Sequence, residues 1–262
     1  DTFTQFSDLP VSKPPFTRIP FREAMLKYGT DKPDLRNPLI IIDLTDFFSK
    51  VDFPAFQGKI VRGIRVPGAA KQSKRWFKFA TEIGMGGLGY LEVQEDLSYK
   101  GPIDKFMTDE QKKEIAQTAD PQPEDVLYFI SDEPDTVARY AGQIRTEVAK
   151  RLNLIDKDRF EFCYIVDFPM FEINEETGKI DFTHNPFSMP QGEMEALETM
   201  NPLDINAYQY DIVCNGYELS SGAVRNHRTD VMVKAFEIAG YDEDVVKQKF
   251  GALYNAFQYG AP

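Results

Sequence analysis

Apolar and polar residues alternate along the chain in two patterns, short apolar runs and stripes at helical spacing. Apolar runs bounded by Gly, Pro or Asp are typical of strands, and they predict strands within residues 39–48, 59–67, 89–96 and 160–171. The last run is nearly continuous, which is typical of a central strand. Amphipathic spacing predicts helices in residues 71–84 and 108–119 and a short helix that ends at Gly29.

Longer apolar stripes predict helices that pack on a core. They comprise Val137, Ala141, Ile144, Val148 and Leu152 in one segment, Met232, Ala235, Phe236 and Ala239 in the next, and Val246, Phe250, Leu253 and Phe257 in the last. Thr229 is expected to cap the second of these helices and Gly240 to end it. Strands mixed with helices in this way predict an α+β fold, in which the section from about Leu39 to residue 132 forms an α+β unit of its own.

The pair Asn215-Gly216 lies between two apolar runs and predicts a two-residue hairpin turn, because both residues tolerate positive φ. Direct pairing from this turn places Cys214 opposite Tyr217, Val213 opposite Glu218, Ile212 opposite Leu219 and Asp211 opposite Ser220. One face then carries Asp211, Val213, Glu218, Ser220 and Gly222. The other face, with Tyr210, Ile212, Cys214, Tyr217 and Leu219, is the apolar one and is expected to be buried.

Asp211 and Glu218 become diagonal neighbours in this hairpin, about 7 Å apart at the backbone. Carboxylates at that spacing repel unless a cation lies nearby, and a Mg²⁺ that bridges to phosphate oxygens fits such a pair. Ser220, Ser221 and Gly222 leave a bare floor for a flat ligand, and Arg225 offers a planar fork for a carboxylate or phosphate. The alternative is an exposed hairpin with ordinary surface charges.

A second candidate segment, DFTHNPFSMP, places His184 and Asn185 at the tip of a loop between Pro and Phe residues. A single histidine is more often structural. Together, however, the hairpin and the loop offer two carboxylates, an arginine and a histidine, a set that suits recognition of a small acid and a metal-bound polyphosphate.

Composition narrows these options. The net charge of −12 argues against non-specific nucleic-acid binding by excess positive charge, although a local basic patch is allowed. Cys163 and Cys214, the two cysteines, lie in apolar runs and are expected to be buried free thiols, which implies a reducing compartment. The two histidines exclude a His-rich zinc site, and no apolar run has the length of a membrane span.

The motifs YGTDKPDLRNP, RGIRVPGAA, GPIDKF, VDFPMF, HNPFSMP, NGYELSSGAVRNH and FGALYNAFQYGAP occur in this order over essentially the whole chain. In sequence and order they resemble the bacterial-type aspartyl-tRNA synthetases, which are class II aminoacyl-tRNA synthetases, and specifically the alphaproteobacterial form. The resemblance implies that residues 1–38 and 133–262 are pieces of the antiparallel-sheet catalytic core. Residues 39–132 would be the inserted GAD domain.

The resemblance also implies an activity. Aspartate and ATP give aspartyl-adenylate and pyrophosphate, with Mg²⁺, and the aspartyl group then moves to tRNA(Asp). Whether tRNA(Asn) is also charged stays open. The expected protein is a cytoplasmic homodimer without a membrane segment.

By the same resemblance, Arg225 pairs with the side-chain carboxylate of L-aspartate, and His184 belongs to the loop that closes over it. Glu218 matches the acidic residue at the ATP and magnesium site, with Asp211 as its metal-binding neighbour. Asn185 replaces a more usual histidine and has no assigned role, whereas Ser220 and Ser221 replace glycines and stay small enough for the adenylate floor.

Parts of the family pattern are not found. The anticodon-binding domain and motifs 1 and 2 are absent, and motif 3 is expected a few residues after Pro262. Phe21–Glu23 resembles motif 2, but its acid comes one position early and it opens a helix. We therefore expect a fragment that alone neither activates aspartate nor charges tRNA.

Two other functions stay open. The basic, aromatic stretch of residues 71–79 suits a non-catalytic tRNA-binding module that acts through the GAD domain, or else a solvated helix with aromatic residues in the core. A generic magnesium-dependent carboxylate-activating enzyme is the other alternative.

Overall fold

The computed structural model describes residues 1–260, which fold as a mixed α+β protein made of two compact units. The first unit comprises Asp1–Ser12 and Glu23–Glu161, and the second comprises Lys13–Arg22 together with the chain from Phe162 onward. The last residues of the motif FGALYNAFQYGAP lie outside the described range.

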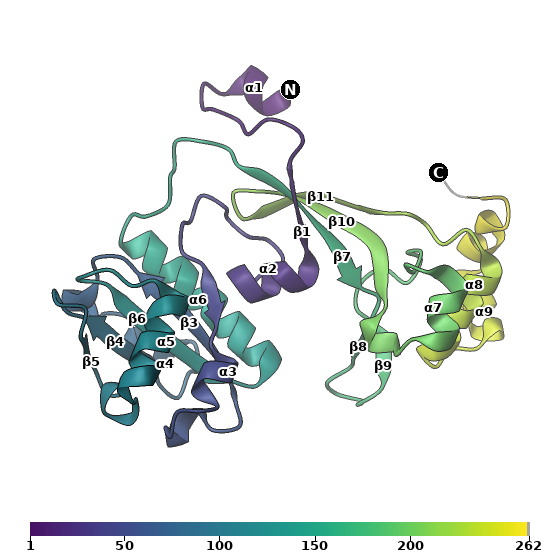
Figure 1. Cartoon of the computed structure of the whole chain (residues 1–262). Helices are drawn as coiled ribbons and strands as arrows, with labels where there is room; N and C mark the ends of the chain where they lie inside the picture. The colour runs from purple at the N-terminus through teal and green to yellow at the C-terminus, as the bar shows by residue number, and fades with distance from the viewer. Residues whose placement is uncertain (261–262) are drawn as a thin grey trace. The chain divides into compact units, whose positions relative to one another are not determined.

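The first unit is built on a five-stranded antiparallel sheet in the order β2-β3-β6-β4-β5 (Figure 1). Its strands are β2 (Ile41–Asp43), β3 (Ile60–Val66), β4 (Gly89–Val93), β5 (Tyr99–Lys100) and β6 (Val126–Asp132). Residues 126–130 of the central strand β6 are all buried. Because successive side chains of a strand point to opposite faces, β6 contributes to two cores.

Each face of this sheet has its own hydrophobic core. Tyr128 and Ile130 pack in a cluster with Trp76 and with the apolar stripe of α6 (Pro134–Arg151). Leu127 and Phe129 pack in a second cluster with residues of α3 (Thr45–Phe48) and α5 (Asp109–Ala119). The smaller helical segments of this part of the chain are α1 (Thr2–Phe6), α2 (Phe21–Tyr28), α4 (Phe77–Glu82), η1 (Pro54–Phe56), η2 (Ala70–Gln72) and η3 (Asp104–Phe106).

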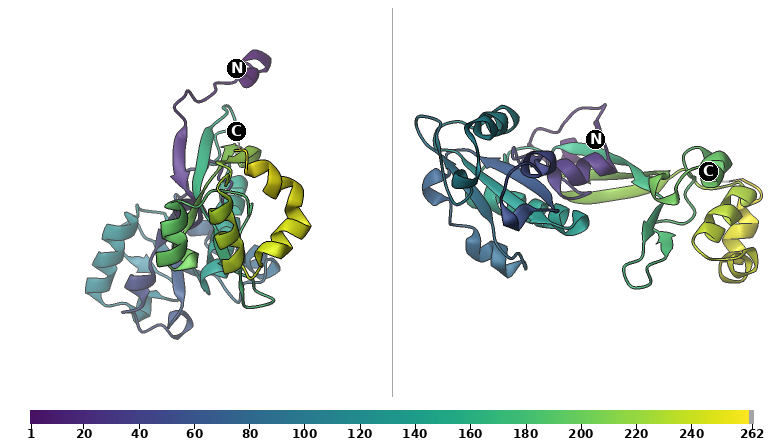
Figure 2. Two further views of the ribbon diagram at one scale, coloured as in Figure 1. Left: turned by 90° about the vertical axis from the view of Figure 1, so that its right-hand side faces the viewer. Right: turned by 60° about the horizontal axis from the view of Figure 1, so that its bottom comes forward.

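The second unit contains a four-stranded sheet in the order β1-β7-β10-β11. The strands are β1 (Thr17–Pro20), β7 (Phe162–Pro169), β10 (Asn206–Cys214) and β11 (Tyr217–Ala223). β1 runs parallel to β7, and the other pairs are antiparallel. β8 (Phe171–Ile173) and β9 (Ile180–Phe182) form a separate ribbon, followed by α7 (Glu193–Thr199), η4 (Pro202–Asp204), α8 (Thr229–Ile238) and α9 (Glu243–Phe257). α8 and α9 pack against each other (Figures 1 and 2).

Most predicted elements are confirmed. The stripe of α6 is fully buried from Val137 to Val148, and Met232, Ala235 and Phe236 of α8 are buried as well. Phe21 opens α2, as expected, and Gly29 follows its last residue with a φ of 68°. Both cysteines are buried, and neither forms a disulfide within residues 1–260, as expected.

Some local predictions are wrong. The helix expected in residues 71–84 begins only at Phe77, because residues 70–72 form a separate 3-10 turn. Thr229 is the first residue of α8 rather than its cap, and Arg228 occupies the cap position. Leu253 is 42% exposed because α9 is interrupted at Phe250, which shifts the buried position to Tyr254.

The compact units do not follow the predicted domain boundaries. Helix α6, expected with the catalytic core, belongs to the first unit because its apolar stripe packs on the same sheet as Trp76. Residues 23–38 also fall in the first unit. The assignment of residues 39–132 to a GAD domain stays a prediction.

Candidate active site

The hairpin of the candidate site is formed by β10 and β11. Asn215 and Gly216 have φ values of 54° and 86°, so both adopt the left-handed conformation of a tight two-residue turn. Cys214 pairs with Tyr217 and Val213 with Glu218. The turn and the first two predicted pairs are therefore confirmed.

Beyond these pairs the predicted register is wrong. A β-bulge between Ile212 and Val213 shifts the pairing, so that Ile212 lies opposite Ser220 and Asp211 opposite Ser221. Leu219 is the extra residue on β11. An inserted residue of this kind cannot be recognised from an alternating pattern, because the alternation on either side of it continues.

The prediction of the buried face is also wrong. Tyr210, Tyr217 and Leu219 are 41%, 74% and 47% exposed, whereas Val213, on the face with the carboxylates, is fully buried. β11 is the edge strand of its sheet, and residues 217–221 are all exposed. An edge strand with a bulge does not present one continuous buried face.

Asp211 and Glu218 nevertheless remain on one face of the hairpin. Val213 is paired with Glu218, and Asp211 lies two residues before Val213, so both carboxylates leave the sheet on the same side. Asp211 is partly buried and Glu218 is exposed. Among residues 1–260, no group of three or more His, Cys, Asp or Glu side chains could hold a metal ion. The pair Asp211 and Glu218, which would need substrate phosphates to complete a metal site, is smaller than such a group.

Of the predicted ligand floor, Ser220 and Ser221 are exposed, but Gly222 has a neighbour within the chain. A Cβ added at Gly222 would lie 2.4 Å from the hydroxyl oxygen of Tyr210, its cross-strand partner. Gly222 therefore makes room for the Tyr210 ring, which is a packing reason for the glycine that the sequence did not reveal.

The loop that carries His184 is fastened to the hairpin by its backbone. The amide of Met189 donates to the carbonyl of Val224 at 2.8 Å, and the amide of Asn226 donates to that of Phe187 at 2.8 Å. The Gln209 side chain donates to the Ser188 hydroxyl at 2.7 Å and to the Asn185 carbonyl at 3.2 Å. The structure thus brings the loop and the Arg225 segment together, as the sequence interpretation requires.

Gln209 and Ser188 were not recognised from the sequence as positioning residues. Their only signal is polarity within apolar surroundings, since Ser188 is completely buried and Gln209 partly so. Asn185 also has a local structural role, because its side-chain oxygen accepts from the amide of Phe187 at 2.9 Å.

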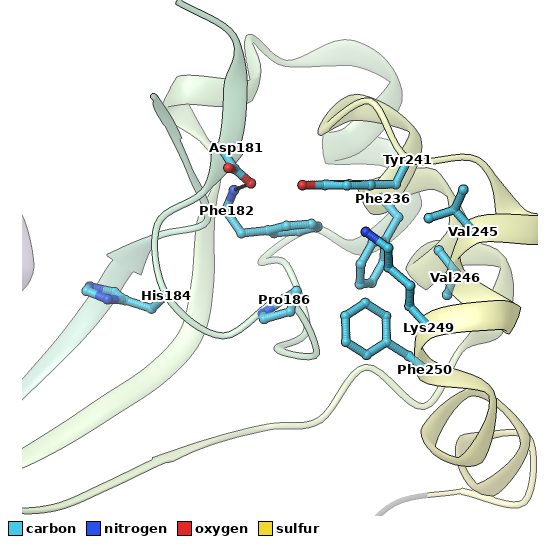
Figure 3. A pocket seen from close by; sticks show the side chains of 10 residues that line it. All are labelled: Asp181, Phe182, His184, Pro186, Phe236, Tyr241, Val245, Val246, Lys249 and Phe250. Carbon is cyan, nitrogen blue, oxygen red and sulfur yellow. Dashed lines mark hydrogen bonds between the residues drawn. The ribbon is translucent and has the colours of Figure 1, made fainter. Parts of the chain in front are cut away.

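His184 is held by aromatic rings. Its imidazole makes edge contacts with Phe168, at a centroid distance of 5.1 Å, and with Phe21 at 6.3 Å. His184 also borders a pocket formed with β9, α8 and α9, and its ring points away from the other residues of that pocket (Figure 3). These contacts limit the orientations open to the ring.

Arg225 follows β11 and is partly buried. Its backbone forms an antiparallel bridge with Ser188, and its carbonyl accepts from the amide of His227 at 3.0 Å. Within residues 1–260 its guanidinium makes no hydrogen bond or ion pair. A partly buried guanidinium without a protein partner among the described residues, on a backbone held in place, is well suited to a planar anionic ligand.

An ion-pair cluster follows the site. Arg228 donates to Glu193 at 2.6 Å and to Asp230 at 2.7 Å, which connects α7 to the start of α8. The hydrogen bond from Arg228 holds the pKa of the Asp230 carboxyl below its usual value. The cluster is exposed, so we expect it to orient this segment more than to stabilise it.

Within residues 1–260, no helix combines the length and the apolarity that a membrane span needs.

The chain belongs to the family of class II tRNA synthetases (D, K and N), whose pattern matches residues 2–262. It is 52% identical over 275 residues to the aspartate–tRNA(Asp/Asn) ligase of Rickettsia bellii, 49% to that of Rickettsia canadensis and 50% to that of Rickettsia prowazekii. Each of these matches covers 100% of this chain but 46% of the relative. The chain therefore spans about half the length of these curated relatives.

Proposed function

We propose that this chain forms part of an aspartate–tRNA ligase. The observation that carries the proposal is Arg225, whose backbone is bridged to Ser188 of the His184 loop and whose guanidinium has no protein partner among the described residues. The Rickettsia relatives, which are 52% and 49% identical to this chain, are named aspartate–tRNA(Asp/Asn) ligases, and this supports aspartate as the substrate.

In this proposal Arg225 binds the side-chain carboxylate of L-aspartate through two parallel hydrogen bonds. Asparagine offers an amide in the same place, so one of its NH₂ hydrogens would face the guanidinium donors, and it is rejected. His184 closes over the bound aspartate, with its ring oriented by Phe168. Asn185 keeps its local role and receives none in binding.

Asp211 and Glu218 would hold Mg²⁺ together with the phosphates of ATP. The two carboxylates fit that ion, since Mg²⁺ prefers oxygen ligands and is commonly bound by one or two carboxylates plus substrate phosphates. When bound, Mg²⁺ would neutralise charge on the phosphate oxygens. Ser220, Ser221 and Gly222 remain the proposed floor for the adenylate, and the Tyr210 ring that covers Gly222 would be part of that surface.

The reaction needs orientation and charge stabilisation rather than a protein nucleophile. An α-carboxylate oxygen of aspartate attacks the α-phosphorus of ATP, and the bond to pyrophosphate breaks. The resulting adenylate is then attacked by a hydroxyl of the tRNA 3′ end, which releases AMP. Arg225 and the loop hold aspartate in place for both steps.

The wider proposal concerns the whole protein. It would charge tRNA(Asp), with tRNA(Asn) as a further candidate substrate, act as a homodimer and work in the cytoplasm. Residues 39–132 would be the GAD insertion domain.

A hybrid enzyme tests this proposal. Residues 1–262 replace the matching segment of the Rickettsia bellii ligase, and aspartate-dependent ATP–pyrophosphate exchange is measured. We expect exchange in the hybrid and a loss of about 3 kcal/mol in transition-state stabilisation, roughly 100-fold in kcat/KM, with Arg225→Gln, because a buried charge pair is broken. Arg139→Gln, which changes an exposed arginine of α6, is the control.

A hybrid that folds with the melting temperature of the parent but shows no exchange would contradict the proposal. So would an Arg225→Gln hybrid that keeps its activity. The same assay on residues 1–262 alone tests the expectation that this polypeptide does not activate aspartate.

A second candidate function is tRNA binding through residues 71–79. Lys74 and Arg75 are exposed there, whereas Trp76 is completely buried. Salt-sensitive tRNA binding that is lost on Lys74→Ala and Arg75→Ala would support this function. Binding that these changes do not affect would exclude the segment.

A further inference from the structure

The second unit contains a pocket with three polar side chains, Asp181, Tyr241 and Lys249, that the proposed reaction does not use. It has a volume of about 250 Å³ and lies between β9, the residues that follow it, and helices α8 and α9 (Figure 3). Small-molecule sites usually measure roughly 300–1,000 Å³. The pocket therefore suits a ligand smaller than a typical drug.

One part of the pocket is apolar. The Phe182 ring packs edge-on against the Phe236 ring, with 4.9 Å between the ring centroids, and the Phe250 and Phe236 centroids are 5.8 Å apart. Val246, which is fully buried, and Pro186 complete this part. Rings and aliphatic groups in this arrangement favour an apolar ligand group and offer it no hydrogen bond.

The other part carries both signs of charge. Figure 3 shows the Asp181 carboxylate and the Tyr241 hydroxyl pointing toward one another, with the Lys249 amine beside the Tyr241 ring. The Lys249 nitrogen lies 5.6 Å from the centre of that ring. A ligand in the apolar part would thus meet an anion and a cation at the same end.

Neither charge is neutralised by an ion pair within residues 1–260. The neighbouring lysines of these helices do have partners, since Lys247 pairs with Glu243 at 2.9 Å and Lys234 with Glu237 at 3.6 Å. Lys249 has Val245 and Leu253 four residues away on its helix, so no carboxylate is within the usual helical reach. Among the described residues, the Asp181 carboxylate accepts from the amide of Phe182 alone, at 2.8 Å.

The backbone of α9 changes course at the pocket. Phe250 has φ −127° and ψ 24°, which interrupts the helix at the residue whose ring lines the apolar part. Gly251 follows directly, and a Cβ there would have no neighbour within 4 Å. The interruption allows the Phe250 ring to contact Phe187 and Phe236, which a regular helix would place differently.

We propose that this pocket binds a free α-amino acid with an apolar side chain. The ligand carboxylate pairs with Lys249, the ligand ammonium pairs with Asp181, and the side chain packs against the pocket-lining rings of Phe182, Phe236 and Phe250. An α-amino acid is the simplest small ligand that joins both charges to one apolar group. His184 borders both this pocket and the proposed aspartate site, but its ring points away from the other residues of the pocket (Figure 3). The inference does not depend on the proposed function.

Binding is measured by saturation-transfer NMR and calorimetry on the chain of residues 1–262. The probe is L-phenylalanine, and it is compared with 3-phenylpropionate, which lacks the ammonium, and 2-phenylethylamine, which lacks the carboxylate. We expect saturable binding of L-phenylalanine at millimolar concentrations and about tenfold weaker binding of each analogue, since each loses one charge-assisted contact.

Two variants assign the charges. Lys249→Met should weaken L-phenylalanine about tenfold and leave 2-phenylethylamine unchanged, whereas Asp181→Asn should weaken L-phenylalanine and leave 3-phenylpropionate unchanged. Lys234→Met, a paired lysine on α8, is the matched control and should change neither. Melting curves confirm that each variant folds.

Three results would overturn the proposal. These are no saturable binding of L-phenylalanine, equal binding of all three probes, and binding that Lys249→Met and Asp181→Asn leave unchanged. A fourth would be displacement of L-phenylalanine by L-aspartate, which would place the ligand in the aspartate site instead.

Discussion

Replacing Arg145 tests how the first unit is held together. Arg145 lies on α6, is 1% exposed, and donates from Nε to the Leu39 carbonyl at 2.6 Å. One terminal nitrogen donates to the carbonyls of Asn37 at 3.0 Å and Asp34 at 3.2 Å. A single side chain therefore connects the helix to the whole segment that leads into β2.

The expected loss can be worked out from these contacts. Hydrogen bonds to a charged group are worth about 1.5–3 kcal/mol each, so three at the lower value give about 5 kcal/mol. Burial lowers the pKa of Arg145 to about 10, and the loss of hydration behind this shift costs the charged form about 3 kcal/mol, at about 1.4 kcal/mol per pKa unit. Methionine removes that cost together with the bonds. Arg145→Met should therefore reduce the free energy of unfolding by about 2–3 kcal/mol.

Urea unfolding followed by the fluorescence of Trp76 measures this loss. Trp76 is the single tryptophan and is fully buried in the first unit, so its signal reports on that unit alone. Arg139→Met, an exposed position on the same helix, should cost less than about 1 kcal/mol.

Arg145→Lys separates the shape of the side chain from its charge. Lysine keeps a buried charge but lacks the planar fork that reaches three carbonyls. It should therefore be at least as unstable as Arg145→Met. A loss below about 1 kcal/mol with methionine, or full stability with lysine, would refute the reasoning.

Two further predictions use the same fluorescence. Gly29→Ala should destabilise the first unit by about 3 kcal/mol, because a Cβ there, at φ 68°, would lie 2.5 Å from the Ala138 carbonyl oxygen. In the control Gly87→Ala, a Cβ would have no atom within 4 Å, so the free energy of unfolding should change by less than about 0.5 kcal/mol. Equal effects of the two substitutions would contradict the packing argument. Burial raises the pKa of the Tyr128 phenol, which donates to the Ser73 carbonyl at 2.8 Å. Because Tyr128 holds its proton more tightly in the folded form than in the unfolded form, the stability that it contributes is present below about pH 10 and lost as the pH rises further. Tyr128→Phe should cost about 1 kcal/mol at pH 7 and make the decline of stability at alkaline pH less steep. An equally steep decline in the variant would contradict the assignment to Tyr128.

The helices and strands of this protein follow closely from its apolar pattern. The stripe from Val137 to Val148 predicted α6 and its buried face, because a helix with one apolar side can hide that side only against a core. The Asn215-Gly216 turn was predictable for a similar local reason, since both residues tolerate the positive φ that the turn requires.

What the pattern could not show depends on contacts distant in sequence or on an inserted residue. The bulge at Leu219 changes the partner of Asp211 without changing the residue types on either side. Gly222 looked like a bare floor for a ligand, yet its space is taken by the Tyr210 ring from the opposite strand. The helical stripe of α9 was continued through Phe250, where the chain leaves the helix, so Leu253 was wrongly placed in the core.

The candidate site also depends on contacts between segments that are distant in the sequence. The hydrogen bonds described between the His184 loop and the Arg225 segment join backbone groups, Gln209 of β10 adds side-chain bonds to the loop, and all of these residues lie in the second unit. The two proposed aspartate-binding residues are thus held in register by their own unit. The Gln209 amide donates to the Asn185 carbonyl and to the Ser188 hydroxyl, so it fastens the loop to β10, the strand that pairs with β11. Selection of the amino acid, as proposed here, would therefore be set within this unit, through Arg225 and the loop that its neighbours fix.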